Sequence, residues 1–146
     1  MSALNAATNP EIETPPLPGL AMDDLEILVV EDDAGDAYLI ETALSRIARV
    51  GCLVRASDGV EAMALIEKGV TPDLALIDLH MPRKSGFNLL LELSCAGHDF
   101  PMVVLTSSTA RADLVRSKLR GATQVLSKPD TVAELTDMLR RVVAEV

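Results

Sequence analysis

The sequence has few of the residues that mark nucleic-acid-binding proteins. Its 146 residues include no tryptophan, one tyrosine and two phenylalanines, and 13 basic residues against 22 acidic ones give a formal net charge of −9. Nucleic-acid binding depends on basic residues that neutralise phosphates and on aromatic residues that stack on bases. The composition therefore predicts that the chain binds no nucleic acid.

Long apolar runs and signal segments are also missing from the sequence. No apolar run approaches the roughly 18 residues of a membrane-spanning helix, and no basic segment is followed by the apolar stretch of a secretory signal. We therefore expect a cytoplasmic protein with no membrane contact. The two cysteines, Cys52 and Cys95, lack the short spacing of a metal or redox pair, so we expect both to be buried free thiols.

Proline and charge distinguish residues 1–24 from the rest of the chain. This segment has no lysine or arginine, four acidic residues, and prolines at Pro10, Pro15, Pro16 and Pro18. Such a composition favours an extended arm that buries little apolar surface. Residues 25–146 are long enough and apolar enough to form one domain with a sizeable core.

Short apolar segments alternate with helical patterns from residue 25 onward. The predicted strands are EILVV, CLVRA, DLALID, MVVLTS and TQVLSK, and a helical pattern follows each of them. Apolar strands joined by helices predict a parallel sheet that is covered on both sides. Right-handed crossovers favour an α/β, flavodoxin-like, doubly wound (βα)5 sandwich, with a five-stranded parallel sheet in the order 2-1-3-4-5.

Polar residues follow the predicted strands at the edge of the sheet where such folds bind ligands. They are Glu31 and Asp32 after the first strand, Asp78 after the third, Thr106 on the fourth and Lys128 after the fifth. Each residue alone also fits a helix cap, an ordinary strand position or a solvated strand end. The order 2-1-3-4-5 makes these four strands neighbours, so it predicts that all five residues meet in one cleft.

Three carboxylates in one cleft need a cation. Two carboxylates about 4 Å apart repel by about 4 kcal/mol at an effective dielectric constant near 20. Oxygen ligands with room for water suit Mg²⁺. A carboxylate beside that ion can attack phosphorus and form an acyl phosphate, while Thr106 and Lys128 supply a hydroxyl and a positive charge for the phosphoryl oxygens. The pattern predicts Mg²⁺-dependent phosphoryl transfer.

Four segments of the sequence resemble the receiver domain of two-component response regulators. These are ILVVEDD, DLALIDLHMPRKSGFNLL, VVLTSS and VLSKPD, in this order and at the spacing of that family. The resemblance implies that Asp78 accepts a phosphoryl group from the phosphohistidine of a partner sensor histidine kinase. It also implies that Mg²⁺ is held by Glu31, Asp32, Asp78 and the backbone carbonyl of His80.

The same resemblance assigns roles to further residues. Thr106 would be the switch hydroxyl and Lys128 the lysine typical of the family, while Asp33 would only start or cap the first helix. His80 and Ser108, two positions after Asp78 and Thr106, would flank the path of the attacking water and set the phosphoryl lifetime.

One position departs from the family pattern. Val125 stands where receiver domains often carry an aromatic residue that moves inward when the switch hydroxyl bonds the phosphoryl group. The usual coupling between a threonine and an aromatic ring is therefore not expected. The segments VEDDAGDAYLI and DLHMPRKSGF are similar to those of stand-alone receivers that accompany bacteriophytochrome histidine kinases.

Charge on the last two predicted helices favours self-association. Since the sequence runs only to Val146, we expect no DNA-binding module and a single-domain regulator that signals by dimerisation or protein docking. Basic residues gather on the fourth helix, at Arg111, Arg116, Lys118 and Arg120. Acidic residues gather on the fifth helix and its approach, at Asp130, Glu134, Asp137 and Glu145. Opposite charges on neighbouring elements predict a two-fold homodimer, with the arm lying across the partner through Ile12, Leu17, Leu20 and Met22.

Two other functions use parts of the same pattern. A phosphohydrolase of the haloacid dehalogenase type also uses an aspartate, Mg²⁺, a hydroxyl and a lysine, but it usually has a DxD signature after its first strand and a cap domain. Here Asp78 ends the third predicted strand. A degenerate receiver that only binds partners would not need the complete set of acids, threonine and lysine. We therefore expect a phosphoacceptor signalling protein that catalyses its own phosphorylation and slow dephosphorylation.

Overall fold

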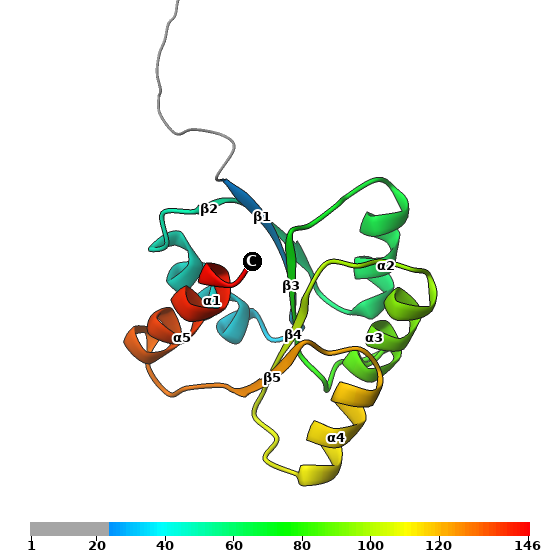
Figure 1. Cartoon of the computed structure of the whole chain (residues 1–146). Coiled ribbons are helices and arrows are strands. Elements are labelled where there is room, and N and C mark those ends of the chain that lie inside the picture. Colours follow the sequence, from blue (N-terminus) through cyan, green and yellow to red (C-terminus); the bar gives the residue numbers. More distant parts are fainter. Residues whose placement is uncertain (1–23) are drawn as a thin grey trace, which may run out of the picture.

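The computed structural model describes residues 24–146 as one alternating series of strands and helices (Figure 1). Most of the predicted arm, including Ile12, Leu17, Leu20 and Met22, lies outside the described residues. The elements are β1 (Leu25–Val30), α1 (Ala34–Ser45), β2 (Val50–Ala56), α2 (Gly59–Glu67), β3 (Leu74–Ile77), α3 (Gly86–Cys95), β4 (Met102–Thr106), α4 (Arg111–Leu119), β5 (Gln124–Ser127) and α5 (Val132–Ala144).

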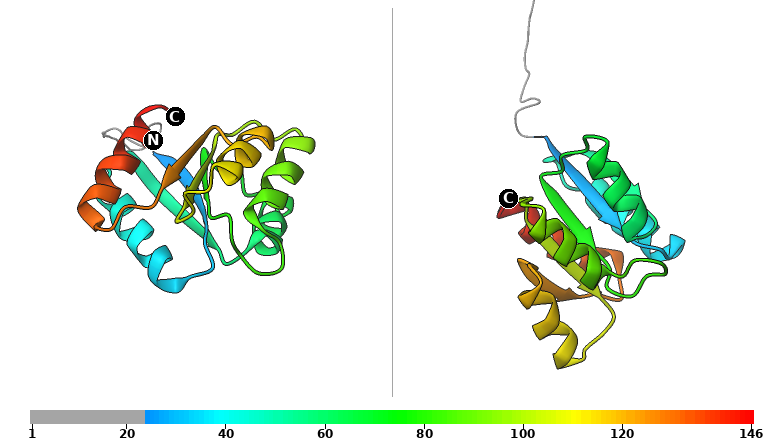
Figure 2. Two further views of the ribbon diagram at one scale, coloured as in Figure 1. Left: turned by 90° about the horizontal axis from the view of Figure 1, so that it is seen from below. Right: turned by 90° about the vertical axis from the view of Figure 1, so that its right-hand side faces the viewer.

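The five strands form one parallel sheet in the order β2-β1-β3-β4-β5. Helices α1 and α5 cover one face of the sheet, and α2, α3 and α4 lie on the other (Figures 1 and 2). Successive residues of a strand point to opposite faces, and Ile27 and Val29 accordingly pack toward α1 and α5 while Leu28 and Val30 pack toward α2 and α3. The predicted flavodoxin-like fold is confirmed.

Side-chain caps explain where most of the helices begin. Asp33, Asp58, Ser85 and Thr131 each accept a hydrogen bond from the backbone N–H three residues further on, which satisfies one of the free donors of a helix start. The prediction that Asp33 caps the first helix is confirmed. Helix α4 differs, because it begins after Ala110 with no side-chain cap.

The prediction of two buried cysteines is wrong. Cys52 and Cys95 are free but exposed. Cys52 lies on β2, an edge strand whose first half is largely exposed, and Cys95 is the last residue of α3. Apolar neighbours in the sequence therefore did not imply burial at the edge of the sheet or at the end of a helix.

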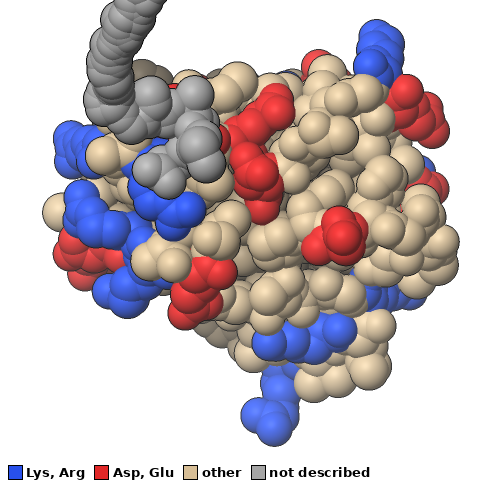
Figure 3. All heavy atoms as spheres, turned by 45° about the horizontal axis from the view of Figure 1, so that its top comes forward, with Lys and Arg blue, Asp and Glu red and all other residues tan. Residues whose placement is uncertain are grey.

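The surface carries both signs of charge. On the face drawn in Figure 3, acidic and basic side chains form separate small groups among uncharged residues. Within residues 24–146, no helix has the length and apolar composition needed to cross a lipid bilayer.

Candidate functional site

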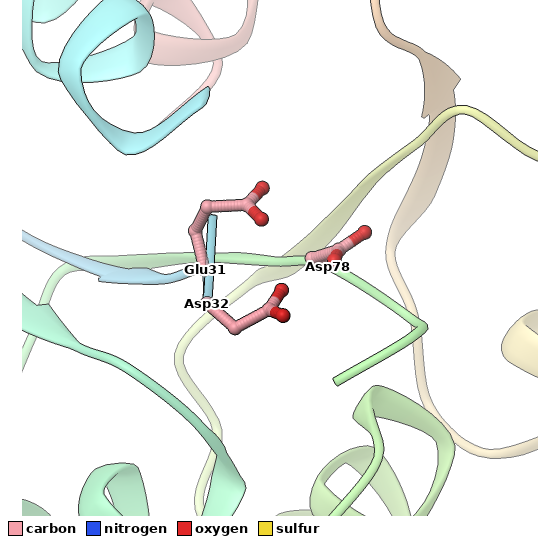
Figure 4. Close-up of side chains that lie close together, drawn as sticks. All are labelled: Glu31, Asp32 and Asp78. Carbon is pink, nitrogen blue, oxygen red and sulfur yellow. The ribbon is translucent and has the colours of Figure 1, made fainter. Parts of the chain in front are cut away.

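Three carboxylates meet at the ends of the two central strands. Glu31 and Asp32 follow β1 and Asp78 follows β3, and the Asp78 N–H donates to the carbonyl of Val30 at 3.0 Å. Each of the three acidic residues offers a carboxylate oxygen that lies within 4.8 Å of those of the other two. Figure 4 shows these side chains gathered side by side.

Burial makes two of these carboxylates hard to ionise. Glu31 is 1% exposed and Asp78 is 8% exposed. The pKa of Glu31 is raised to about 7, chiefly by loss of water and further by the Asp78 charge, against the opposing effect of Lys128. Burial also raises the pKa of Asp78, and the nearby charge of Asp32 adds to the rise. The site therefore favours a positive charge beside these oxygens.

Lys128 supplies one such charge from the end of β5. Its Nζ atom donates to Glu31 Oε1 at 2.8 Å and to Asp36 Oδ2 at 2.9 Å, and it lies 3.6 Å from Asp78 Oδ1. Burial alone would lower the pKa of the amine, but its hydrogen bonds to Glu31 and Asp36 outweigh burial and raise it. Lys128 is therefore a fixed cation at the site.

Asp36 is a residue of the site that the sequence did not reveal. It lies in the first turn of α1, where acidic residues are common at any helix start. Its contact with Lys128 joins residues that are 92 positions apart. No local pattern distinguishes such a contact from an ordinary helix-terminal acid.

Thr106 and Ser108 connect the end of β4 to the following loop. Thr106 is buried, its hydroxyl accepts the Ser108 N–H at 3.0 Å, and its carbonyl accepts the Lys128 N–H at 2.9 Å. These bonds align the ends of β4 and β5 beside the carboxylates. The predicted hydroxyl and ammonium groups are thus on the same edge of the sheet as the acids.

The predicted modulators His80 and Ser108 meet at a residue that the sequence did not indicate. The Ser108 hydroxyl donates to Asp113 Oδ2 at 2.8 Å, and His80 Nε2 lies 3.4 Å from the same oxygen. The His80 side chain is 63% exposed. Asp113 resembles any acidic residue in a first helical turn, so only the fold shows its contacts.

The loop between β3 and α3 is fixed by polar contacts and by close backbone packing. Arg83, whose φ is 65°, donates to the buried Asp58 at 2.7 Å. The Glu61 N–H lowers the pKa of Asp58, and Arg83 lowers it further against the effect of burial. At the other end of the loop, a Cβ on Gly86 would lie only 2.2 Å from the Asp78 carbonyl oxygen. Only glycine fits there without displacing the Asp78 backbone.

The donor set fits a small divalent cation. The three carboxylates offer only oxygen, two of them are buried and repel each other, and Asp32 is exposed to solvent. Mg²⁺ binds through a few carboxylates while it keeps several waters, and an exposed rim leaves room for them. Glu31, Asp32 and Asp78 can therefore hold such an ion.

Comparison with protein families places the site in a known setting. A family model described as the response regulator receiver domain matches residues 27–140. The regulator of RpoS from Escherichia coli (strain K12) is 35% identical over 104 residues, which are 71% of this chain and 30% of that protein. Response regulator MprA from Mycobacterium sp. (strain KMS) is 34% identical over 116 residues, which are 80% of this chain and 49% of that protein. The chain spans less than half the length of these two relatives.

Two solved structures have a similar fold over most of the chain. The phosphorylated cyanobacterial phytochrome response regulator RcpA has a TM-score of 0.75 and 28% sequence identity, with 82% of this chain and 91% of that chain covered. The Mn²⁺-bound form of response regulator Rcp1 has a TM-score of 0.72 and 29% identity, with 81% and 91% covered. One of these relatives thus carries phosphate and the other a divalent cation.

Proposed function

The chain belongs to the response regulator receiver domain family, and we propose that it is a single-domain response regulator that accepts a phosphoryl group on Asp78. The observation that carries the proposal is the position of the Asp78 carboxylate. One of its oxygens lies within 4.8 Å of a carboxylate oxygen of both Glu31 and Asp32, and Oδ1 lies 3.6 Å from Nζ of Lys128. The Asp78 carboxylate is therefore close both to a candidate cation site and to a fixed positive charge.

The proposed step transfers a phosphoryl group from the phosphohistidine of a sensor histidine kinase. An Asp78 carboxylate oxygen forms a bond to phosphorus while the P–N bond breaks, and the histidine nitrogen keeps the electron pair and takes a proton from solvent. Mg²⁺, when bound, neutralises charge on the phosphoryl oxygens. Glu31, Asp32, Asp78 and the backbone carbonyl of His80 are the proposed protein ligands.

Lys128 and Thr106 are proposed to bind the phosphoryl oxygens. Lys128 Nζ already lies 3.6 Å from Asp78 Oδ1, so a phosphoryl group on that carboxylate gains a charge-assisted hydrogen bond. The Thr106 hydroxyl serves as an acceptor for the Ser108 amide, which leaves its own proton for a phosphoryl oxygen. Both groups stabilise charge at fixed positions.

The kinase is proposed to be a bacteriophytochrome. This proposal rests on the similarity to RcpA, which is described as a cyanobacterial phytochrome response regulator. It is supported further by the segments VEDDAGDAYLI and DLHMPRKSGF of this sequence. Phosphotransfer from a purified bacteriophytochrome kinase that is faster than from an unrelated histidine kinase would support it, and equal rates would refute it.

Output is proposed to use a homodimer formed through α4, β5 and α5. Helix α4 exposes Val115 and Leu119, which are 49% and 82% exposed, beside its basic residues. Position 125 is occupied by a valine that is partly buried against the core. No aromatic ring at that position therefore takes part in the proposed output. Apolar residues rimmed by charge are typical of protein interfaces.

Acetyl phosphate with Mg²⁺ tests the phosphoacceptor. Mass spectrometry should find one added phosphate on the peptide that contains Asp78, and EDTA should abolish labelling. Asp78→Asn should lose labelling. Asp99→Asn, which changes an exposed acid outside the carboxylate cluster, should keep it. Steady turnover of acetyl phosphate would instead indicate a hydrolase, and no labelling would indicate a binding module.

A further inference from the structure

One carboxylate outside the proposed phosphorylation site joins the two loops that flank it. Asp113 lies in the first turn of α4. Its Oδ2 atom accepts the Ser108 hydroxyl at 2.8 Å and lies 3.4 Å from Nε2 of His80. A single oxygen therefore contacts one side chain from the loop after β3 and one from the loop after β4. We call these three residues the Asp113 clasp.

The clasp turns both flanking side chains toward α4. The Ser108 oxygen also accepts the Ala110 N–H at 3.2 Å, so its donor and an acceptor site are both occupied by the start of α4. The His80 ring packs edge-on against Phe87, with 6.0 Å between the ring centroids. The Arg116 guanidinium, also from α4, lies 4.0 Å from the centroid of the same Phe87 ring. His80 is therefore held on the α4 side of its loop.

Polar contacts matter more for the position of α4 than apolar packing does. The buried residue of this helix is Ser117, whose hydroxyl has no hydrogen-bond partner within the described part of the chain. Val115 and Leu119 are exposed, and no side chain caps the first turn. Burial of apolar surface is usually the main stabilising term for an element. Because α4 buries little apolar surface, the clasp contributes much of what holds its first turn in place.

We propose that Asp113 is a positioning residue that prolongs the lifetime of the phosphoryl group on Asp78 by occupying the Ser108 hydroxyl and Nε2 of His80. This inference rests on the proposed function of Asp78. In the step concerned, a water oxygen bonds to phosphorus while the bond to the Asp78 oxygen breaks. The carboxylate keeps the electron pair, and the proton of the water passes to phosphate or solvent.

The clasp controls this step through hydrogen bonding to the water. While Asp113 engages them, neither the Ser108 hydroxyl proton nor Nε2 of His80 is free to orient a water for attack. Release of the clasp frees both groups to bond such a water. Because Asp113 belongs to α4, any partner that shifts the first turn of α4 also changes the phosphoryl lifetime.

The test follows loss of phosphate from the full chain after labelling with acetyl phosphate and Mg²⁺ and removal of the donor. Asp113→Ala should accelerate the loss about fivefold, the factor that corresponds to one net hydrogen bond. Asp113→Asn keeps an oxygen acceptor and should stay within about twofold of the wild type. In a His80→Ala/Ser108→Ala background, Asp113→Ala should have no further effect, because residues that act through one another do not add.

The matched control is Glu61→Ala. Glu61 is also an acidic residue in a first helical turn, that of α2, and its removal should leave the rate unchanged. Alanine favours helix at both positions, and thermal melting verifies that each variant is folded. The inference is overturned if Asp113→Ala leaves the rate of phosphate loss unchanged or lowers it. It is also overturned if Asp113→Ala accelerates the loss as much in the His80→Ala/Ser108→Ala background as in the wild type. Failure to label the wild type would overturn the proposed function as well.

Discussion

Glu31 shows how its position changes the chemistry of a single carboxylate. It follows an ordinary apolar strand, yet it is 1% exposed and its pKa is about 7 instead of the usual 4.5. Lys128 at 2.8 Å offsets only part of the cost of burial. The carboxylate is thus kept in an unfavourable state that a second cation would relieve, as expected where stability is traded for function.

This cost gives a prediction for the dependence of stability on pH. Folded Glu31 keeps its proton up to about pH 7, whereas the unfolded chain releases it near 4.5. The folded state therefore binds more protons between these values, and the free energy of unfolding in EDTA should fall as the pH rises through them. Glu31→Gln should remove most of this fall and raise stability at pH 8 by about 1–3 kcal/mol.

Urea unfolding between pH 5 and pH 8 in EDTA measures this effect. Glu67→Gln, which changes an exposed acid at the end of α2, is the control and should follow the wild type. A Glu31→Gln profile parallel to that of the wild type would contradict the prediction.

Neighbouring aspartates should differ in their effect on Mg²⁺ binding. Asp32 belongs to the carboxylate cluster, whereas Asp33 caps α1. A ligand that binds only the folded state stabilises that state by about 1.4 kcal/mol when its free concentration is about ten times its Kd. Mg²⁺ should therefore raise the Tm of the wild type and of Asp33→Asn equally, and that of Asp32→Asn much less.

Differential scanning fluorimetry with Mg²⁺ or EDTA separates these cases. Loss of the cap in Asp33→Ala should lower the Tm in both conditions, with a cost of about 1 kcal/mol. An Mg²⁺ shift that is equal in all variants would show that Asp32 is not a ligand.

At the scale of elements, the start of α3 determines where the Asp78 backbone lies. Gly86 is the first residue of α3, and its N–H donates to the Leu79 carbonyl at 2.9 Å. The loop between these residues is attached to α2 through Arg83 and Asp58. The position of the proposed acceptor thus depends on a helix that contributes no side chain to the carboxylate cluster.

A pair of glycine substitutions tests this dependence. Gly86→Ala would place a Cβ 2.2 Å from the Asp78 carbonyl oxygen, so it should cost about 2–3 kcal/mol of stability and slow labelling of Asp78. Gly35→Ala, in α1, would place its Cβ 3.5 Å from an Asp33 oxygen, an ordinary contact. It should leave labelling unchanged and stabilise the chain by about 0.5–1 kcal/mol, because glycine is unfavourable in a helix. Urea unfolding measures stability, and acetyl phosphate measures labelling. If the two substitutions have similar effects on both, the proposed role of Gly86 is refuted.

At the scale of the whole molecule, the carboxyl edge of the sheet and the exposed surface of the helices have different roles. The carboxyl ends of the strands hold the acids, Thr106 and Lys128. The helices pack on both faces of the sheet, form the core together with the strands, and supply much of the exposed surface (Figure 1). Helix α4 contributes to both, because its first turn reaches the site through Asp113 and its last turn exposes Leu119. A partner on α4 therefore has a short path to the site.

Self-association should depend on this exposed surface. Leu119→Lys should weaken the proposed dimer at least about tenfold, since an apolar side chain at an interface centre is replaced by a charge. Leu91→Lys on α3, which changes another exposed leucine at 42% exposure, should leave it intact. Light scattering over a concentration series measures both.

The arm is tested by the same measurement. A chain that begins at Asp24 should form a weaker dimer than the full chain if residues 1–23 lie across the partner subunit. If the full chain and the shortened chain are both monomeric at all concentrations, the proposed dimer is refuted. If both chains form dimers of equal affinity, the proposed dimer is supported and the proposed role of the arm is refuted.

Local patterns in the sequence determined the fold and the acidic cluster. Apolar runs such as those before Glu31 and Asp78 mark strands buried on both faces, and caps such as Asp33 and Asp58 mark helix starts within a few residues. These signals depend only on near neighbours in the chain. The rules of parallel sheets then bring the strand ends together.

Only the tertiary structure decided which side chains contact one another across the strand ends. The contacts of Asp36 with Lys128 and of His80 with Asp113 join residues far apart in sequence, and the exposure of Cys52 follows from the edge position of β2. The physical reason is that such contacts depend on distances of a few ångströms between packed elements. The order of residues along the chain sets which groups reach the edge of the sheet, and packing sets which of them meet.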